Sequence, residues 1–288
     1  MENVLFIGDS ITDAGTYVAL VDTFLRLYMP AKEFKINNIG LCSENTSALT
    51  EAGHPCERPN IAMRIDKILD YYNIDRAIIM YGINDGIYKS FSEERFSAFK
   101  SGMTNLVARL RERGVGAIYV CTPSAFDPRC SVTPLSDVID DNPIGTLYSG
   151  YNSVMSAYAE WIRTDLATSV DKIVDINAVM NAYIDEKHAS CANFSTGDGI
   201  HPNLQTSAVL ASAVLHDGFG FANNISNLLV DKTFMRLFKL VRVRDGLQHD
   251  FDKETIGHTL PWHARLLPRE KLDKKLARLD KKIAKALQ

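Results

Sequence analysis

The sequence has 288 residues, of which 46% are hydrophobic and 23% are charged, and its formal net charge at pH 7 is -3. This length and composition are typical of a globular protein and suffice for one large α/β domain with an appendage. The small negative charge gives no reason to expect a nucleic-acid partner. The sequence contains no apolar run of about 18 residues, so no membrane span is predicted.

The N-terminus shows neither the basic nor the apolar segment of a signal peptide, because the first predicted strand begins at once. We therefore expect a cytoplasmic protein, although a secreted or periplasmic form whose signal has been removed would look the same. The five cysteines are odd in number and lack Cys-x-x-Cys spacing, so no disulfide framework or zinc site is predicted. The histidines outside the motifs below, His188 among them, show no ligand spacing, so we expect no metal.

Short apolar runs alternate with amphipathic stretches from the N-terminus to about residue 218. We predict buried strands over residues 4–7, 34–39, 76–81, 117–121 and 172–176. Between and after them, helical periodicity predicts helices over residues 17–28, 61–72, 92–113, 146–166 and 178–186, and a further helix opened by residues 198–202. This alternation predicts a five-stranded parallel sheet with helices on both faces, a three-layer α/β/α sandwich.

The alternation ends near residue 218, so we divide the chain into an α/β domain, residues 1–218, and a helical C-terminal extension, residues 219–288. In this accessory extension, an amphipathic stretch over residues 225–241 precedes a polar linker over residues 245–259 and a closing helix. The closing helix carries one apolar stripe among lysines: Leu272, Leu276, Leu279, Ile283 and Leu287. We expect the stripe to pack on the body or on a second copy, which would form a homo-oligomer, whereas binding to an anionic membrane is the alternative.

Residues that can carry chemistry follow the ends of the predicted strands. Ser10 follows the first strand, Gly40 the second and Asn84 the third, whereas Asp198 and His201 come after the fifth. Because the carboxyl ends of parallel strands lie at one edge of a sheet, we expect these residues to meet.

These residue types are the ones that acyl transfer needs. A serine hydroxyl is a weak nucleophile until a base takes its proton, and an imidazole, with an unperturbed pKa of about 6.5, can be that base. A carboxylate three residues before the histidine can orient the ring and stabilise the imidazolium. The backbone N–H groups of Ser10 and Gly40 and the side-chain amide of Asn84 can form an oxyanion hole, in which one donor is worth about 3 kcal/mol of barrier.

Four sequence blocks carry a family resemblance: Gly8-Asp9-Ser10-Ile11-Thr12, Gly40, Gly82-Ile83-Asn84-Asp85 and Asp198-Gly199-Ile200-His201-Pro202. In this order they resemble the four blocks of the SGNH hydrolases, also called the GDSL esterase/lipase family, over residues 1 to about 218. The resemblance implies a flavodoxin-like fold, with Ser10 as nucleophile, His201 as base, Asp198 as its partner, and Ser10, Gly40 and Asn84 as oxyanion donors. Ile11 stands where other members have the name-giving Leu. The Gly-x-Ser-x-Gly elbow of the α/β-hydrolases is absent.

The loops beside these motifs indicate which class of substrate to expect. Residues 41–60 and 122–143 are polar, and no long apolar lid is predicted, so a short acyl group, such as acetyl on a carbohydrate, fits better than a long lipid chain. We expect a serine esterase without cofactor or metal that acts on a small-molecule or oligosaccharide ester. The alternatives are a lysophospholipase or thioesterase acting on lipid acyl groups, and a non-catalytic carbohydrate-binding module on this scaffold.

Several polar residues near the motifs have two interpretations. His54, Arg58 and Tyr88 are candidate substrate-binding residues, although a surface loop carries polar side chains in any case. We expect Asp9 to bind backbone around its turn, and Asp85 to order the loop that bears Asn84.

Overall fold

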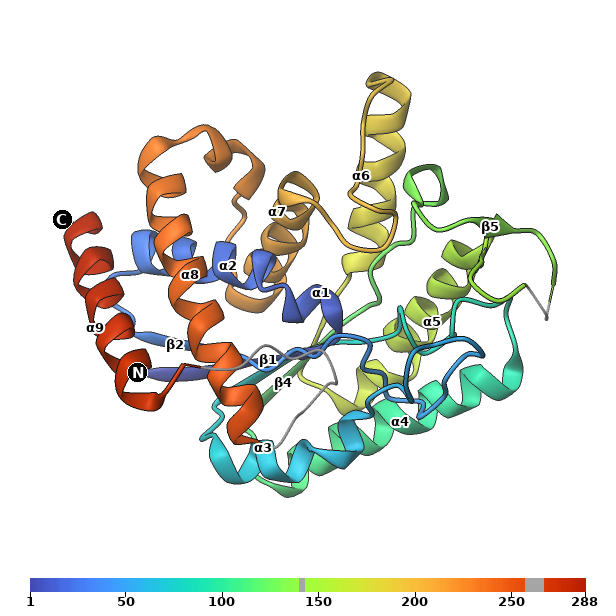
Figure 1. The fold of residues 1–288 in the computed structure, drawn as a ribbon, viewed down its shortest axis with the longest axis horizontal. Helices are drawn as coiled ribbons and strands as arrows, with labels where there is room; N and C mark the ends of the chain where they lie inside the picture. Colours follow the sequence, from blue (N-terminus) through green and yellow to red (C-terminus); the bar gives the residue numbers. More distant parts are fainter. Residues whose placement is uncertain (140–142, 257–266) are drawn as a thin grey trace.

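The computed structural model describes residues 1–139, 143–256 and 267–288. One parallel sheet forms the centre of the molecule, with the strand order β2-β1-β3-β4-β7 (Figure 1). The strands are β1 (Glu2–Gly8), β2 (Phe34–Asn38), β3 (Arg76–Met80), β4 (Ala117–Cys121) and β7 (Lys172–Val174). The predicted five-stranded parallel sheet is confirmed.

Strand β1 lies in the interior of the sheet and pairs with both β2 and β3. Phe6 is opposite Asn38 on one side and Ile78 on the other. Residues 4–7 of β1 and 77–80 of β3 are all buried, because helices cover both faces. Strands of this kind show continuous apolar runs, which is why they were visible in the sequence.

Helices cover the two faces of the sheet (Figure 1). One face carries α3 (Ile65–Tyr71) and α4 (Glu93–Glu112), and Phe99 of α4 stacks on Tyr158 of α5 (Tyr151–Thr164). The opposite face carries α2 (Thr16–Tyr28), α7 (Leu204–Ala213) and α8 (Lys232–Thr255). The short α1 (Ser10–Asp13) follows β1, and α6 (Ile176–Ser190) packs against α7.

Two predicted helices begin several residues later in the structure than expected. The helix predicted over residues 61–72 is broken: a 3₁₀ turn, Ile61–Met63, precedes α3, and Arg64 between them leaves helical geometry with a φ of -128°. The helix predicted over residues 146–166 begins only at Tyr151, because Leu147–Tyr148 (β6) pairs with Leu135–Ser136 (β5).

The C-terminal extension is more helical than expected. The predicted polar linker over residues 245–259 is wrong as far as Thr255, because α8 continues through it, whereas residues 257–259 lie outside the described residues. Polar residues of this stretch are buried because they have partners within the protein; for example, Asp252 accepts a hydrogen bond from the hydroxyl of Tyr72 at 2.6 Å. Residue polarity therefore did not indicate a linker here.

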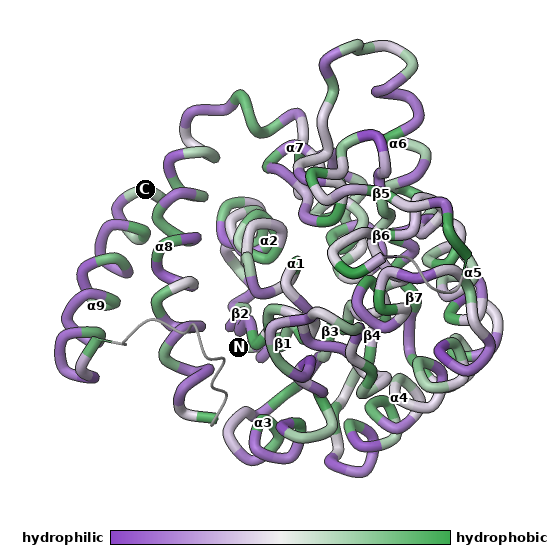
Figure 2. The backbone as a smooth tube through the Cα atoms, turned by 45° about the vertical axis from the view of Figure 1, so that its right-hand side comes forward, coloured by the Kyte–Doolittle hydropathy of each residue, from purple (hydrophilic) through white to green (hydrophobic). Residues whose placement is uncertain are grey.

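The closing helix, α9 (Arg269–Ala286), packs beside α8 (Figure 2). Three residues of its apolar stripe, Leu272, Leu276 and Ile283, are buried, whereas Leu287 is 40% exposed. The stripe thus packs on the body of its own chain. A homo-oligomer through this helix and a domain boundary at residue 218 stay predictions.

Among the described residues, no helix combines the length and apolar character that crossing a bilayer requires.

The packing of α9 can be tested with one buried residue and its exposed neighbour. Ile283→Ala should lower the free energy of unfolding by about 2–5 kcal/mol, because it removes buried methyl groups and leaves a cavity. Lys282→Ala, at an exposed position, should change it by less than about 0.5 kcal/mol. Urea unfolding of both variants measures the difference. Equal stability of the two variants would show that α9 does not dock through this stripe.

Candidate active site

Ser10 is the first residue of α1, at the carboxyl end of β1. Asp9 caps this helix, because its Oδ1 accepts a hydrogen bond from the Ile11 N–H at 2.9 Å. The expectation that Asp9 binds backbone around the turn is confirmed. The first N–H groups of a helix have no acceptor within it, so the Ser10 N–H is available to a ligand.

His201 connects Ser10 to Asp198 through its two ring nitrogens. Its Nε2 lies 2.9 Å from the Oγ of Ser10, and its Nδ1 lies 2.8 Å from Oδ2 of Asp198. The other Asp198 oxygen accepts hydrogen bonds from the N–H groups of Ile200 and His201. Burial acts to raise the pKa of Asp198, but these hydrogen bonds outweigh burial and hold that pKa below its usual value. The carboxylate is therefore ionised and fixed beside the imidazole.

The structure gives Gly40 a different role from the expected oxyanion donor. Its N–H donates to Oδ1 of Asn38 at 2.8 Å, and the Asn38 amide in turn donates to the Thr12 carbonyl at 2.6 Å. A Cβ at position 40 would lie 2.3 Å from the backbone nitrogen of Asp13. Glycine is thus required where the end of β2 packs against α1, and its N–H is already used.

A turn over residues 41–44 lies between α1 and Asn84. Its Leu41 N–H donates to the Gly8 carbonyl at 2.9 Å, and its Cys42 N–H donates to Oδ2 of Asp13 at 3.0 Å. Ser43, which follows, has a φ of +63°, in the left-handed region that few non-glycine residues adopt. Its N–H has no hydrogen-bond acceptor within the described ranges of the chain. Ser43 was not predicted from the sequence, where its only signal was its place in the polar turn after Gly40.

Asn84 is oriented by two hydrogen bonds. Its Nδ2 donates to the Glu44 carbonyl of the same turn at 3.0 Å, and its Oδ1 accepts from the Tyr88 hydroxyl at 2.9 Å. One Nδ2 hydrogen is left for a ligand. Tyr88 was expected to bind substrate, but it is buried against Tyr151, at a ring distance of 5.0 Å, and it positions Asn84.

His54 and Arg58 also contact the turn. The Arg58 side chain is 4% exposed, pairs with Glu51 at 2.5 Å, and donates through Nη1 to the Ser43 carbonyl at 3.1 Å. The Nε2 of His54 lies 3.3 Å from the Ser43 Oγ. The structure thus gives both residues a supporting role at Ser43, and their contact with substrate stays a prediction.

Buried carboxylates form the base of the site. Glu44 accepts two hydrogen bonds of 2.6 Å from Arg64, and the Tyr81 hydroxyl donates to the same carboxylate at 2.5 Å. Asp85 accepts three hydrogen bonds of 2.8 Å from Thr46 and Ser47, in the segment after the turn. Asp85 thus ties its own loop, which bears Asn84, to this segment.

The C-terminal extension reaches this site through Asp13. Its Oδ1 lies 2.7 Å from Nε2 of His249 and 2.7 Å from Nζ of Lys253, both on α8. Burial acts to raise the pKa of Asp13, but the hydrogen bonds and charges of these two residues outweigh burial and hold it well below its usual range. Helix α8 therefore fixes the carboxylate that also binds Cys42.

The buried pair beneath the turn can be tested by removing one partner or both. Arg64→Met should lower the free energy of unfolding by about 3–5 kcal/mol, because it leaves the Glu44 carboxylate buried without its counter-charge. The double variant Glu44→Gln/Arg64→Met, which also removes the charge, should recover most of this loss. Urea denaturation of both variants and the wild type gives the values. A double variant as unstable as the single one would show that the buried charge is not the cause.

Asp9 gives a prediction about pH. Burial raises its pKa from 3.8 to about 8. Between these values the folded protein holds a proton that the unfolded chain has released, so the stability contributed by Asp9 falls as pH rises through this window. Asp9→Asn keeps the capping oxygen and removes this titration. The stability of the variant relative to the wild type should therefore increase from pH 5 to pH 8, by up to about 1.4 kcal/mol per pH unit. Guanidinium unfolding at each pH measures this, and a constant difference would show that Asp9 is ionised in the fold.

Comparison with known proteins identifies the family of the chain. The model of the GDSL-like lipase/acylhydrolase family matches residues 6–209. No curated protein matches the chain significantly. Among solved structures, a lipase/acylhydrolase from Enterococcus faecalis has a TM-score of 0.53 at 16% identity, covering 75% of this chain and 94% of the other.

Two further structures share the fold. A carbohydrate acetylesterase family member from Sinorhizobium meliloti has a TM-score of 0.51 at 19% identity and covers 74% of this chain and 95% of the other. A gut microbial diltiazem-metabolizing enzyme has a TM-score of 0.58 at 19% identity and covers 74% of this chain, which spans only 46% of that enzyme. The family match covers most of the chain and includes the carboxyl end of β1, the other strand ends and the Asp198–His201 loop. The chain therefore belongs to the GDSL-like lipase/acylhydrolase family, and it is an SGNH hydrolase that acts on esters.

Proposed function

We propose that the protein is a serine esterase that forms an acyl-enzyme on Ser10. The continuous contact from the Ser10 Oγ through both nitrogens of His201 to Asp198 carries this proposal. A serine that is hydrogen-bonded to an imidazole, whose other nitrogen is held by a carboxylate, has the arrangement that nucleophilic catalysis needs. The binding-module alternative gives no reason for such an arrangement.

The first half of the reaction uses His201 as base and then as acid. Its Nε2 takes the hydroxyl proton while the Ser10 Oγ attacks the ester carbonyl, and Asp198 stabilises the imidazolium. The tetrahedral intermediate then collapses, the bond to the alcohol oxygen breaks, and His201 returns the proton to the leaving alcohol. In the second half, His201 takes a proton from water, which attacks the acyl carbon. The bond to the Ser10 Oγ then breaks, the acid leaves, and His201 returns the proton to Ser10.

The negative charge of each tetrahedral intermediate needs donors at the strand-end edge. We assign this role to the Ser10 N–H, the free Nδ2 hydrogen of Asn84 and the Ser43 N–H, in place of the Gly40 N–H. The available N–H of Ser43 and the hydrogen bond that occupies Gly40 support this assignment. Donors that are fixed before the reaction need no reorganisation when the charge forms.

The substrate that fits this site best is a short acyl ester on a polar carrier, such as an acetylated carbohydrate. The loops around Ser43 and Asn84 contain buried ion pairs and hydrogen-bonded tyrosines, and this polar character supports a polar substrate over a long apolar acyl chain. A structural neighbour described as a carbohydrate acetylesterase family member is consistent with this class. Hydrolysis of lipid acyl groups is the competing outcome in the test below.

Ser10→Ala should lower turnover of p-nitrophenyl acetate by about 10⁴-fold or more, because the nucleophile is lost while the hydrogen-bond network below it stays. Ser153→Ala, at an exposed position on α5, is the matched control and should keep wild-type rates. Circular dichroism confirms that both variants are folded. A folded Ser10→Ala variant with most of its activity would contradict the assignment.

The same assay with esters of increasing chain length tests the substrate class. We expect the highest kcat/KM for acetate, and release of acetate from acetylated oligosaccharides. A preference for long chains or lysophospholipids would indicate a lipid acyl hydrolase instead. No turnover of any ester would favour the binding module.

A further inference from the structure

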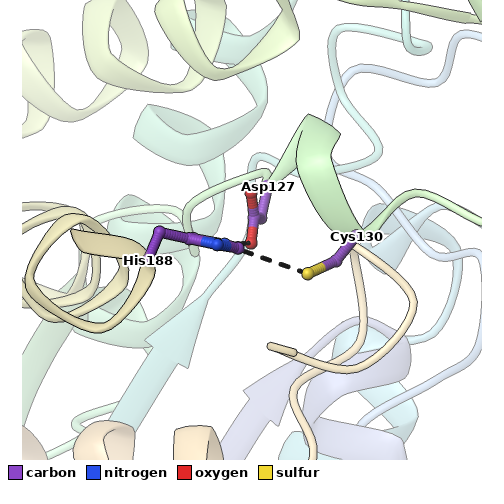
Figure 3. Close-up of side chains that lie close together, drawn as sticks. All are labelled: Asp127, Cys130 and His188. Carbon is purple, nitrogen blue, oxygen red and sulfur yellow. Dashed lines mark hydrogen bonds and ion pairs between the residues drawn. The ribbon is translucent and has the colours of Figure 1, made fainter. Parts of the chain in front are cut away.

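Three donor side chains converge at a second place in the fold. Asp127, Cys130 and His188 each direct one atom toward the other two, and these atoms all lie within 4.8 Å of one another (Figure 3). Nε2 of His188 is 2.8 Å from Oδ2 of Asp127 and 4.0 Å from Sγ of Cys130. Asp127 caps the 3₁₀ turn Pro128–Cys130 and Cys130 is its last residue, whereas His188 is in the last turn of α6.

This cluster has the residue types of a catalytic triad but not its connectivity. In a triad the imidazole contacts its two partners through different nitrogens, as His201 does with Ser10 and Asp198. Here the carboxylate and the thiol both face the same nitrogen of His188. Such an arrangement does not relay a proton from Cys130 to Asp127. It places three donor atoms around one point, as metal ligands are placed.

The donor atoms are held by the surrounding structure. Asp127 is 1% exposed, and its other oxygen accepts hydrogen bonds from the N–H and the Nε of Arg129, at 3.2 and 3.1 Å. The hydroxyl of Thr196 lies 3.3 Å from the Asp127 oxygen that faces His188. The ring of His188 packs edge-on against Phe194. Outer contacts of this kind orient the ligands of protein metal sites.

The spacing of the donor atoms fits a small tetrahedral ion. Zinc binds thiolate at about 2.3 Å, imidazole at about 2.0–2.1 Å and carboxylate at about 2.0–2.2 Å, which puts tetrahedral ligands roughly 3.3–3.6 Å apart. The separations of 2.8 and 4.0 Å lie on either side of this range. Changes of about half an ångström would therefore bring these two separations into the range for tetrahedral ligands.

We propose that Asp127, Cys130 and His188 bind one divalent transition-metal ion of the zinc class, with water as the fourth ligand. A thiolate among the ligands disfavours Mg²⁺ and Ca²⁺, which prefer oxygen donors. The thiolate and the carboxylate together neutralise the charge of a divalent ion. The sequence showed no ligand spacing because His188 lies 58 positions after Cys130 and is brought to it only by α6.

The ion would stabilise the loop that carries Asp198 and His201. The Asp127 N–H donates to the Gly199 carbonyl at 2.9 Å, and the Val132 N–H donates to the Asp198 carbonyl at 3.3 Å. A Cβ at Gly199 would lie 2.7 Å from the Asp127 carbonyl, so the two segments are in close backbone contact. The ion would thus fix α6 and this loop together without contacting the reacting ester.

Cobalt provides a direct test, because a thiolate bound to Co²⁺ absorbs through charge transfer and a tetrahedral site gives intense visible bands. The full-length protein, freed of metal with a chelator, is titrated with Co²⁺ and then with Zn²⁺. We expect both signatures at one equivalent, and their loss when Zn²⁺ displaces Co²⁺. Zinc should also raise the midpoint of thermal unfolding. The absence of charge transfer would overturn the proposal.

Matched variants locate the site. Cys130→Ser should abolish the charge transfer, and His188→Gln should weaken zinc binding at least tenfold, because each substitution removes one of the three proposed ligands. Cys191→Ser and His216→Asn change an exposed cysteine and an exposed histidine and should leave both signals intact. Circular dichroism of the metal-free variants separates a lost ligand from a lost fold. A signal that survives Cys130→Ser, or that disappears with Cys191→Ser, would contradict the assignment. These readouts do not involve ester turnover, so they are independent of the proposed function.

Discussion

The parallel pairing of β1 with both β2 and β3 is the constraint on which the site depends. The pairing of Phe6 with Asn38 and of Gly8 with Met80 brings the ends of three strands to one edge of the sheet. The first residue of α1, the turn after β2 and the loop after β3 must therefore meet there. A change of register in β1 would separate Ser10 from Asn84 even if every side chain were kept.

Around this edge, buried charges hold the backbone in place. Glu44 is neutralised by Arg64, and Asp85 accepts several hydrogen bonds from Thr46 and Ser47. An unpaired buried charge is costly, so each carboxylate requires its partners to stay in place. This requirement makes the turn rigid, and it explains how Ser43 is held in a left-handed conformation that is unfavourable for serine.

Local patterns predicted much of this fold and the meeting of the motif residues, whereas the hydrogen-bond partners that distant segments give to individual groups were not predictable. The strands were recognisable because burial on both faces makes them continuous apolar runs, and Ser10, Asp198 and His201 because they lie in short motifs. The Gly40 N–H could not be excluded as a donor from sequence, since its acceptor depends on how the Asn38 side chain lies against α1. The helical course of residues 245–255 was missed because the polar side chains there find partners on other elements.

Asp13 gives the C-terminal helices a thermodynamic connection to the chemistry. One carboxylate binds His249 and Lys253 of α8 through one oxygen and Cys42 of the turn through the other. The free energy of docking α8 and the free energy of holding the turn therefore both depend on the contacts of Asp13. Such coupling acts equally in both directions. Under the proposed mechanism, a molecule that binds α8 or α9 would change how readily the turn accepts an oxyanion. Conversely, the acyl-enzyme proposed on Ser10 would change how firmly those helices are held.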